Sequence, residues 1–183
     1  MMEKKFDFLY ILRIAGVLFL ISALVALLLS AVNMLTEDKI AANSLDRMND
    51  SIAGIFGGDI TSVKLDGVFQ APVKDIYEVY DGNDSLLGYA VYAVPTGFKG
   101  DIEMMIGVTL AGNCKNVEII SMSETPGLGT KVGEAAHLDQ YHNAEGHLVL
   151  GEDIIPVAGA TISSRTVNTA VNAAVNAVGG ITG

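Results

Sequence analysis

The sequence predicts an α+β protein, in which an N-terminal transmembrane helix is followed by an antiparallel-sheet domain with a packed C-terminal helix. Three observations predict this class: one long apolar stretch near the N-terminus, four β-rich segments joined by turn sequences, and valines at helical spacing near the C-terminus. Strands followed by a helix, without repeated βαβ units, are typical of α+β domains. The 183 residues, 50% apolar and 17% charged, leave room for one domain with an appendage.

Residues 14–34 are predicted to form the transmembrane helix. From Ile14 to Val32 the only polar side chains are Ser22 and Ser30, and a helix of about 20 such residues spans a hydrocarbon core of roughly 30 Å. A buried core helix would show one polar face, and a cleaved signal peptide has an apolar stretch of about 7–15 residues. Neither alternative fits, so we expect a retained, single-pass anchor in the cell membrane.

The charged residues predict the orientation of this anchor. Lys4, Lys5 and Arg13 precede it, so the positive-inside rule places residues 1–13 in the cytoplasm and the part beyond the helix outside. That outer part holds 8 of the 11 basic and 19 of the 21 acidic residues, a net charge of −11. Nucleic acids require a basic surface, so we expect the membrane but no nucleic acid among the partners.

Residues 35–58 are predicted to form a connecting helix between the membrane and an extracytoplasmic domain at 59–183. Thr36 is the expected N-cap, because two acidic residues follow it in the first turn, where the helix dipole favours them. Gly57 and Gly58 are expected to end this helix.

Four segments are predicted to be strands, at residues 73–81, 86–95, 102–110 and 115–124. They are rich in β-branched and aromatic residues, and the sequences GNDS, TGFKG and AGNC between them are typical of turns. Connections this short join antiparallel neighbours, so we expect a four-stranded meander.

The segment 125–156 is expected to be mostly loop, and no metal centre is predicted in it. His137, His142 and His147 are five residues apart, which turns them through about 500° on a helix, so they cannot share a face. We therefore expect exposed loop histidines. Cys114 is the only cysteine, which excludes an internal disulfide and a thiolate cluster, and a small, partly buried residue near a turn is expected there.

Residues 163–178 are predicted to form the C-terminal helix. An apolar stripe is expected to pack on the sheet, asparagines form a second stripe, and Gly179-Gly180 is expected to end the helix. The apolar stripe consists of Val167, Val171, Ala174, Val175 and Val178, and the second of Asn168, Asn172 and Asn176.

Two motifs of small residues form the candidate site. The first, ETPGLG at 124–129, follows the last predicted strand; its glycines allow backbone N–H groups to approach a ligand closely, and an ordinary turn is the alternative. The second, GAT at 159–161, precedes the C-terminal helix, whose first N–H groups favour an anion such as phosphate. Thr161 is either part of such a site or only a helix cap, and Arg165 either offsets a ligand's charge or is solvated. Neither a P-loop nor a dinucleotide fingerprint is present.

In this order, the two motifs resemble the covalent-FMN-binding domain family. Further matches are GYA at 88–90, the turn GFKG at 97–100 and Gly107 in the third strand. With the N-terminal span, the resemblance covers almost the whole chain. The best-known members of this family are the G subunit of the Rnf electron-transport complex, which the short length resembles more, and the C subunit of the Na⁺-translocating NADH:quinone reductase.

The resemblance implies FMN as the cofactor, joined by a phosphoester bond to the threonine of the second motif, Thr161. In the family a separate flavin transferase makes this bond with FAD as donor, and the small residues beside the threonine give it access to the hydroxyl. The other cofactor-binding candidates are Glu124, Thr125, Gly127, Leu128, Gly129, Lys131, Gly159, Ala160, Ile162 and Ser163.

Three positions depart from the family pattern. Ala158 stands where Ser or Thr is usual, Ile155 where an acidic residue is often found, and Met122 where a histidine often precedes ETPGLG. The first two departures bear on recognition by the transferase and not on the fold.

The resemblance implies electron transfer within a membrane-bound, redox-driven ion-translocating complex of the Rnf type, which is a ferredoxin:NAD⁺ oxidoreductase. The other membrane subunits of that complex would be the partners. The sequence shows no nucleophile–base pair and no metal cluster, so no turnover by this chain alone is expected. Alternatives are a component of a Na⁺-translocating NADH:quinone reductase, a free-standing extracytoplasmic flavin carrier, or, in another class, a tethered non-redox binding module in which Thr161 only caps the helix.

Overall fold

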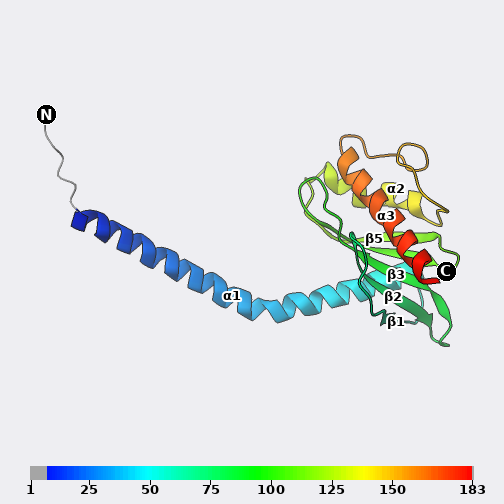
Figure 1. Cartoon of the computed structure of the whole chain (residues 1–183), viewed down its shortest axis with the longest axis horizontal. Coiled ribbons are helices and arrows are strands. Elements are labelled where there is room, and N and C mark those ends of the chain that lie inside the picture. The colour runs from blue at the N-terminus through cyan, green and yellow to red at the C-terminus, as the bar shows by residue number, and fades with distance from the viewer. Residues whose placement is uncertain (1–7, 183) are drawn as a thin grey trace. The chain divides into compact units, whose positions relative to one another are not determined.

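The computed structural model describes residues 8–182 (Figure 1). Part of the predicted cytoplasmic segment, residues 1–7, lies outside the described residues. The side chains at 8, 9, 35–42 and 44, which include the predicted cap Thr36, are not described either. The chain divides into two units, Met1–Leu45 and Asp46–Gly183. Each unit is described by itself.

Helix α1, Phe8–Phe56, contains 49 residues without a break. The helix start predicted at Thr36 is therefore absent, because residues 17–53 contain neither glycine nor proline and nothing in the sequence interrupts the helix. The predicted C-terminal end is confirmed. Gly57 and Gly58 both adopt a φ of +74°, a left-handed conformation in which the helix cannot continue.

One part of α1, Tyr10–Met34, is long and apolar enough to cross a membrane, judged by length and composition. The predicted span at 14–34 lies inside it. Large apolar side chains such as Phe19 and Leu27 are exposed along this stretch. A row of exposed apolar side chains of this length fits a lipid environment.

The sheet is a five-stranded antiparallel meander in which every strand pairs with its neighbours in sequence. Its strands are β1 Ile60–Lys64, β2 Val73–Asp81, β3 Leu86–Ala93, β4 Ile102–Thr109 and β5 Cys114–Met122. The four predicted strands and their order are confirmed. The edge strand β1 was not predicted, because its five residues, ITSVK, are too short and too polar for a clear alternation.

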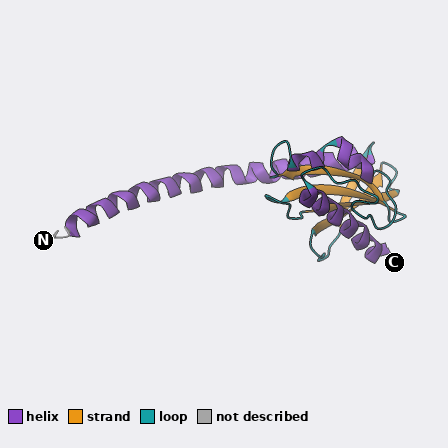
Figure 2. Cartoon of the chain, turned by 90° about the horizontal axis from the view of Figure 1, so that it is seen from above, coloured by secondary structure: helices purple, strands orange, loops and turns teal. Residues whose placement is uncertain are grey.

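Helix α3, Thr161–Thr182, packs on one face of the sheet (Figure 2). The predicted apolar stripe is confirmed, because Val167 and Val171 are fully buried against Val91 and Ile106 of the central strands. The end predicted at Gly179-Gly180 is wrong, since α3 continues to Thr182. Neither glycine takes a positive φ, so neither forms the left-handed cap that would stop a helix.

The other face of the sheet packs against the last residues of α1. Ile52 and Ile55 are buried there with Ala90 and Met105, which alternate along β3 and β4 with the residues under α3. The α+β architecture is thus confirmed in residues 46–182, with one hydrophobic cluster on each side of the sheet.

The segment after β5 consists of loops and three short helical turns, η1 Gly129–Gly133, α2 Ala135–Leu138 and η2 Asp139–Tyr141. Two buried asparagines of α3 hold its later part. The Asn172 side chain donates to the Leu148 carbonyl (2.8 Å) and accepts from the Leu148 N–H (2.9 Å), and Asn168 also donates to that carbonyl (2.9 Å). The asparagine stripe therefore fixes a loop and does not face only solvent.

Candidate functional site

A cavity of about 300 Å³ lies where three segments of the domain meet: the turn between β3 and β4, the loop after β5, and the beginning of α3. It brings together nine of the predicted cofactor-binding residues. The lining residues are Phe98, Glu124, Thr125, Leu128, Gly129, Gly159, Ala160, Thr161, Ile162 and Ser163.

The N-terminus of α3 forms one wall of this cavity. The Ser164 N–H donates to the Ala160 carbonyl (2.9 Å), which is the first bond of the helix, so the N–H groups of Thr161, Ile162 and Ser163 precede the intrahelical ladder. Such groups carry a partial positive charge and favour an anion. Ala160 occupies the capping position and Thr161 is the first helical residue, with an exposed side chain. The interpretation of Thr161 as the helix cap is therefore wrong.

Glu124 links the loop after β5 to the turn between β3 and β4. Its side chain is only 5% exposed, and its Oε1 accepts a hydrogen bond from the Phe98 N–H (2.6 Å) and a longer one from the Lys99 N–H (3.5 Å). Hydrogen bonds from backbone N–H groups to a carboxylate are among the stronger ones in proteins. The first residue of the ETPGLG motif thus has a structural role as well as lining the cavity.

Two glycines keep the cavity open. Gly159 has a φ of +80°, and a Cβ there would lie 2.9 Å from Leu128 Cδ1. A Cβ on Gly129 would lie 2.6 Å from Glu124 Oε2. A side chain at Gly159 would push the two motifs apart, and one at Gly129 would displace the Glu124 side chain. Gly129 of ETPGLG and Gly159 of GAT are therefore needed for these close approaches.

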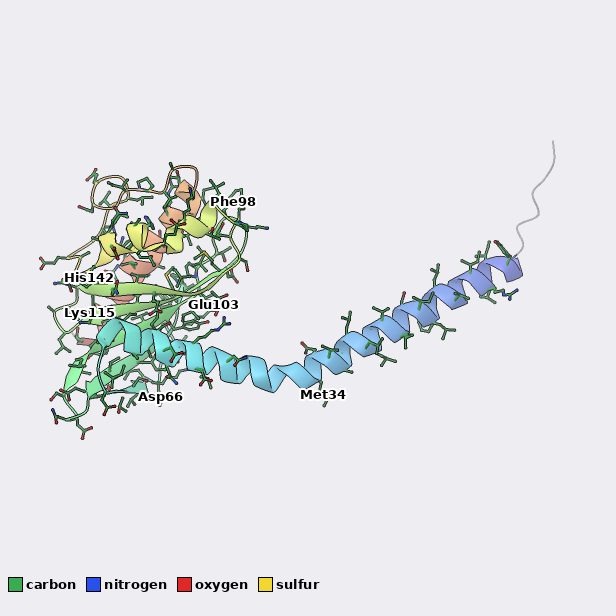
Figure 3. All side chains as sticks on the ribbon, turned by 180° about the vertical axis from the view of Figure 1, so that it is seen from behind. Met34, Asp66, Phe98, Glu103, Lys115 and His142 are labelled. Carbon is green, nitrogen blue, oxygen red and sulfur yellow. The ribbon has the colours of Figure 1, made fainter. Side chains whose placement is uncertain are left out.

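Apolar side chains surround the polar N-terminus of α3. Phe98 is 69% exposed, Ile162 50% and Leu128 45%, and all three line the cavity. Figure 3 shows Phe98 at the surface of the domain. The turn around Phe98 was recognised from the sequence, but Phe98 itself was not predicted to be part of the site. An aromatic side chain in the middle of the polar turn TGFKG was the signal that could have found it.

Two predicted residues do not line this cavity. The Gly127 N–H donates to Thr130 Oγ1 (2.9 Å) at the surface of the loop. Lys131 lies in η1, is exposed, and lines a neighbouring cavity of about 450 Å³ together with His137 and Ile155.

The prediction of exposed histidines is wrong for one of the three. His142 and His147 are exposed, but His137 is 3% exposed and packs edge-on against Tyr141. Burial lowers the pKa of His137, so the ring is neutral near pH 7. No group of three or more His, Cys, Asp or Glu side chains within residues 8–182 is arranged to hold a metal ion.

Cys114, at the start of β5, is buried more completely than the partly buried residue that was expected. Burial raises the pKa of its thiol to about 12. The thiol is therefore unreactive and acts as a small apolar side chain.

Residues 97–176 match the family described as the FMN-binding domain. Every residue that lines the cavity lies within this range. The match to this family thus includes both motifs and the whole cavity lining, as the sequence predicted.

Similarity to two relatives covers most of the chain. The chain is 26% identical to the G subunit of the Na(+)-translocating ferredoxin:NAD(+) oxidoreductase complex of Acetobacterium woodii, over 93% of this chain and 92% of that protein. It is 27% identical to the G subunit of the proton-translocating ferredoxin:NAD(+) oxidoreductase complex of Clostridium ljungdahlii, over 86% of this chain and 85% of that protein.

Among solved structures the chain resembles NqrC of Shewanella oneidensis, with a TM-score of 0.52 and 16% identity over 81% of this chain and 96% of that one. This likeness shows the fold alone. Together with the matching family and the two relatives, it confirms the predicted relationship.

The residues at the cavity fit FMN in two respects. The N–H groups at the start of α3 and the exposed hydroxyl of Thr161 suit a phosphate, and the side chains of Phe98, Leu128 and Ile162 offer an apolar surface for an aromatic ring system. Gly159 leaves space between the phosphate-binding N–H groups and the apolar surface, where a side chain would otherwise lie.

Proposed function

We propose that this chain is the flavin-carrying, electron-transfer subunit of a membrane-bound ion-translocating oxidoreductase complex of the Rnf type, with FMN joined to Thr161 by a phosphoester bond. The FMN-binding domain and the names of the two relatives support the class of protein. The observation that supports the attachment point is the exposed Thr161 side chain at the first position of α3, on the wall of the cavity.

Each part of the cavity has a task in holding the flavin. The N–H groups at the start of α3 would bind the phosphate, and Gly159 and Ala160 leave room for it. Leu128 and Ile162 would contact the ring system and exclude water from one side of it. When bound, FMN accepts and passes on electrons; the protein supplies attachment, orientation and the surrounding electrostatics.

The attachment reaction needs a flavin transferase and FAD. Thr161 Oγ1 forms a bond to the phosphorus of the FMN part of FAD, the bond to the bridging oxygen of the phosphoanhydride breaks, and AMP leaves. The hydroxyl proton goes to a base of the transferase or to water. The exposure of Thr161 and the absence of bulk at Gly159 and Ala160 leave the hydroxyl open to that enzyme.

The membrane placement completes the proposal. The Tyr10–Met34 part of α1 would anchor the chain with its N-terminus in the cytoplasm and the FMN-binding domain outside, next to the other members of the complex. Electron transfer through the flavin needs a donor and an acceptor, which the other members of the complex would supply.

The attachment is tested by the intact mass of the full chain after co-expression with a flavin transferase. We expect a gain equal to FMN less one water in the wild type and in Thr169→Val, an exposed threonine on the same helix. Thr161→Val and Thr161→Ala are expected to show no gain. A folded wild-type chain that stays unmodified beside an active transferase would contradict the proposal.

Membership in a complex is tested separately, in membranes solubilised with a mild detergent. The flavin fluorescence of this chain is expected to migrate with several other membrane proteins in a native gel. Migration as an isolated flavoprotein would instead indicate a free-standing carrier.

A further inference from the structure

Phe98 lies in a turn that is held more firmly than its exposure suggests. The turn connects β3 to β4, and 69% of the Phe98 side chain is exposed. At its base, Thr96 Oγ1 donates to Asp101 Oδ1 (2.9 Å), and the Gly97 N–H donates to the Gly100 carbonyl (2.8 Å). Thr166 of α3 donates to the Thr96 carbonyl (3.3 Å). The turn is therefore fixed on two sides, although an aromatic side chain at its tip is left in the open.

Glu124 adds the contact that fixes Phe98 itself. Its buried carboxylate accepts the Phe98 N–H at 2.6 Å, 26 positions away in the sequence. Gly97 permits this approach, because a Cβ there would collide with Glu124 Oε1. A Cβ on Gly100 would lie 2.9 Å from Ser123 Cβ, so the turn also lies against the residue before Glu124.

This arrangement places an aromatic ring at the cavity and uses a buried acidic group to keep it there. Apolar packing does not explain the position of the Phe98 ring, since most of its surface is exposed. The same cavity contains the Thr161 side chain. An aromatic side chain beside a flavin ring gains stacking energy that it lacks in the isolated chain.

We infer that Phe98 is a flavin-contacting residue, which covers one side of the bound FMN, and that Glu124 is a positioning residue, which holds Phe98 through the Phe98 N–H. This inference rests on the proposed function. It adds a contact outside the two motifs and gives the acidic residue of ETPGLG a task distinct from direct contact with the flavin.

The test uses the full chain in detergent, co-expressed with a flavin transferase, after intact mass has shown one FMN per chain. Iodide quenching of the flavin fluorescence measures how exposed the ring is. We expect stronger quenching in Phe98→Ala and wild-type quenching in Phe98→Tyr, which keeps the aromatic ring. In a Thr161→Val background, free FMN should bind roughly two- to tenfold more weakly when Phe98→Ala is added.

The Glu124 variants test the positioning role. Glu124→Ala removes the acceptor and is expected to increase iodide quenching, whereas Glu124→Gln keeps an oxygen acceptor and should restore much of the protection. In the double variant Phe98→Ala/Glu124→Ala, the increase should not exceed that of Phe98→Ala alone. Phe98 is exposed, so its substitution should leave the unfolding midpoint unchanged and the fold intact.

Three results would overturn the inference, or one part of it, in distinguishable ways. FMN attached to Thr161 with unchanged iodide quenching and unchanged affinity in Phe98→Ala would refute the Phe98 contact alone and leave the proposed function standing. A folded wild-type chain without FMN would refute the proposed function, and the inference with it. Additive effects of Phe98→Ala and Glu124→Ala would refute the positioning role of Glu124.

Discussion

The two faces of the sheet differ most clearly at neighbouring residues of β4, Ile106 and Gly107. Ile106 is fully buried beneath α3, in the larger hydrophobic cluster. Gly107 lies beneath the last residues of α1, where a Cβ would collide with Ile55 Cγ2. At this point of β4, the α3 face is packed by a large side chain of the strand. On the α1 face, the strand has no side chain, and this lets Ile55 of α1 approach closely.

The two helices also present opposite ends to the domain, and only the end of α3 lies at the cavity. A helix N-terminus presents unpaired N–H groups and a partial positive charge, and α3 brings such an end to the cavity. The part of α1 on the other face is a C-terminal end, closed by Gly57 and packed by Ile52 and Ile55. Its carbonyl groups carry a partial negative charge, which does not suit a phosphate.

The largest expected loss of stability comes from removing a buried side chain on the α3 face. Ile106→Ala should lower the free energy of unfolding by about 2–5 kcal/mol, because it removes buried methyl groups and leaves a cavity. Urea unfolding of the full chain in detergent, followed by tyrosine fluorescence, measures this loss. Val63→Ala, at a half-exposed position of β1, is the control and should change stability by less than about 0.5 kcal/mol. A similar loss in both variants would contradict the packing described for α3.

Adding a side chain on the α1 face should destabilise the domain by overpacking, the opposite of a cavity. Gly107→Ala adds a methyl group where Ile55 already lies, and we expect a loss of about 1–3 kcal/mol from overpacking. Gly179→Ala, inside α3 with nothing within 4 Å, is the matched control and should stabilise by up to about 1 kcal/mol. The two substitutions are chemically identical, so equal effects in the unfolding assay would exclude the close contact at Gly107.

The asparagines of α3 allow a test within the α3 face itself. Asn172→Ala should cost about 1–3 kcal/mol, because both backbone groups of Leu148 lose their hydrogen bonds to this side chain. Asn176→Ala, one turn further on and exposed, should cost less than about 0.5 kcal/mol. Hydrogen exchange at the Leu148 amide would detect the loosened loop directly. Unchanged exchange in Asn172→Ala would show that the loop is held by other contacts.

Local patterns were sufficient to predict most of the fold. The β-branched and aromatic residues and the turn sequences predicted β2 to β5, and the valine spacing predicted the buried face of α3. Local patterns failed where the deciding contribution was not local. The edge strand β1 is defined by pairing with β2, and the two glycines near the end of α3 remain helical although the pair is a common stop signal.

The site was predictable only in part, for the same reason. The glycines and the threonine of the two motifs can be recognised in the sequence, because glycine allows close backbone approach and threonine supplies a hydroxyl group. That Glu124 binds the Phe98 N–H, and that Lys131 lines a neighbouring cavity, depends on how the loop after β5 folds back. His137 was misassigned because burial in a four-residue helix leaves no periodic pattern to detect.

The two faces should also respond differently to acid. On the α3 side, burial lowers the pKa of His137, so between the ordinary value near 6.5 and the lower value in the folded chain the unfolded state binds more protons. Stability from this group is thus present above about pH 6.5 and is lost as the pH falls, by at most about 1.4 kcal/mol per pH unit. Thermal unfolding at pH 7, 6 and 5 should show a shallower decline in His137→Gln than in wild type. The exposed His142→Gln should follow the wild type, and an equal change in both would contradict the buried, neutral ring.

On the α1 side the expected effect is smaller and opposite in sign. Burial, with a contribution from Asp50, raises the pKa of Glu118, so the folded state binds a proton more readily than the unfolded state. The contribution of this group is most favourable below about pH 4.5 and is lost as the pH rises through the folded value. Glu118→Gln should therefore stabilise the chain at pH 7, by less than about 0.5 kcal/mol because water screens this partly buried carboxylate, and should lose that advantage near pH 4. If Glu118→Gln instead destabilised the chain at pH 7, the carboxylate would have a favourable partner on α1, which would contradict the raised pKa of Glu118.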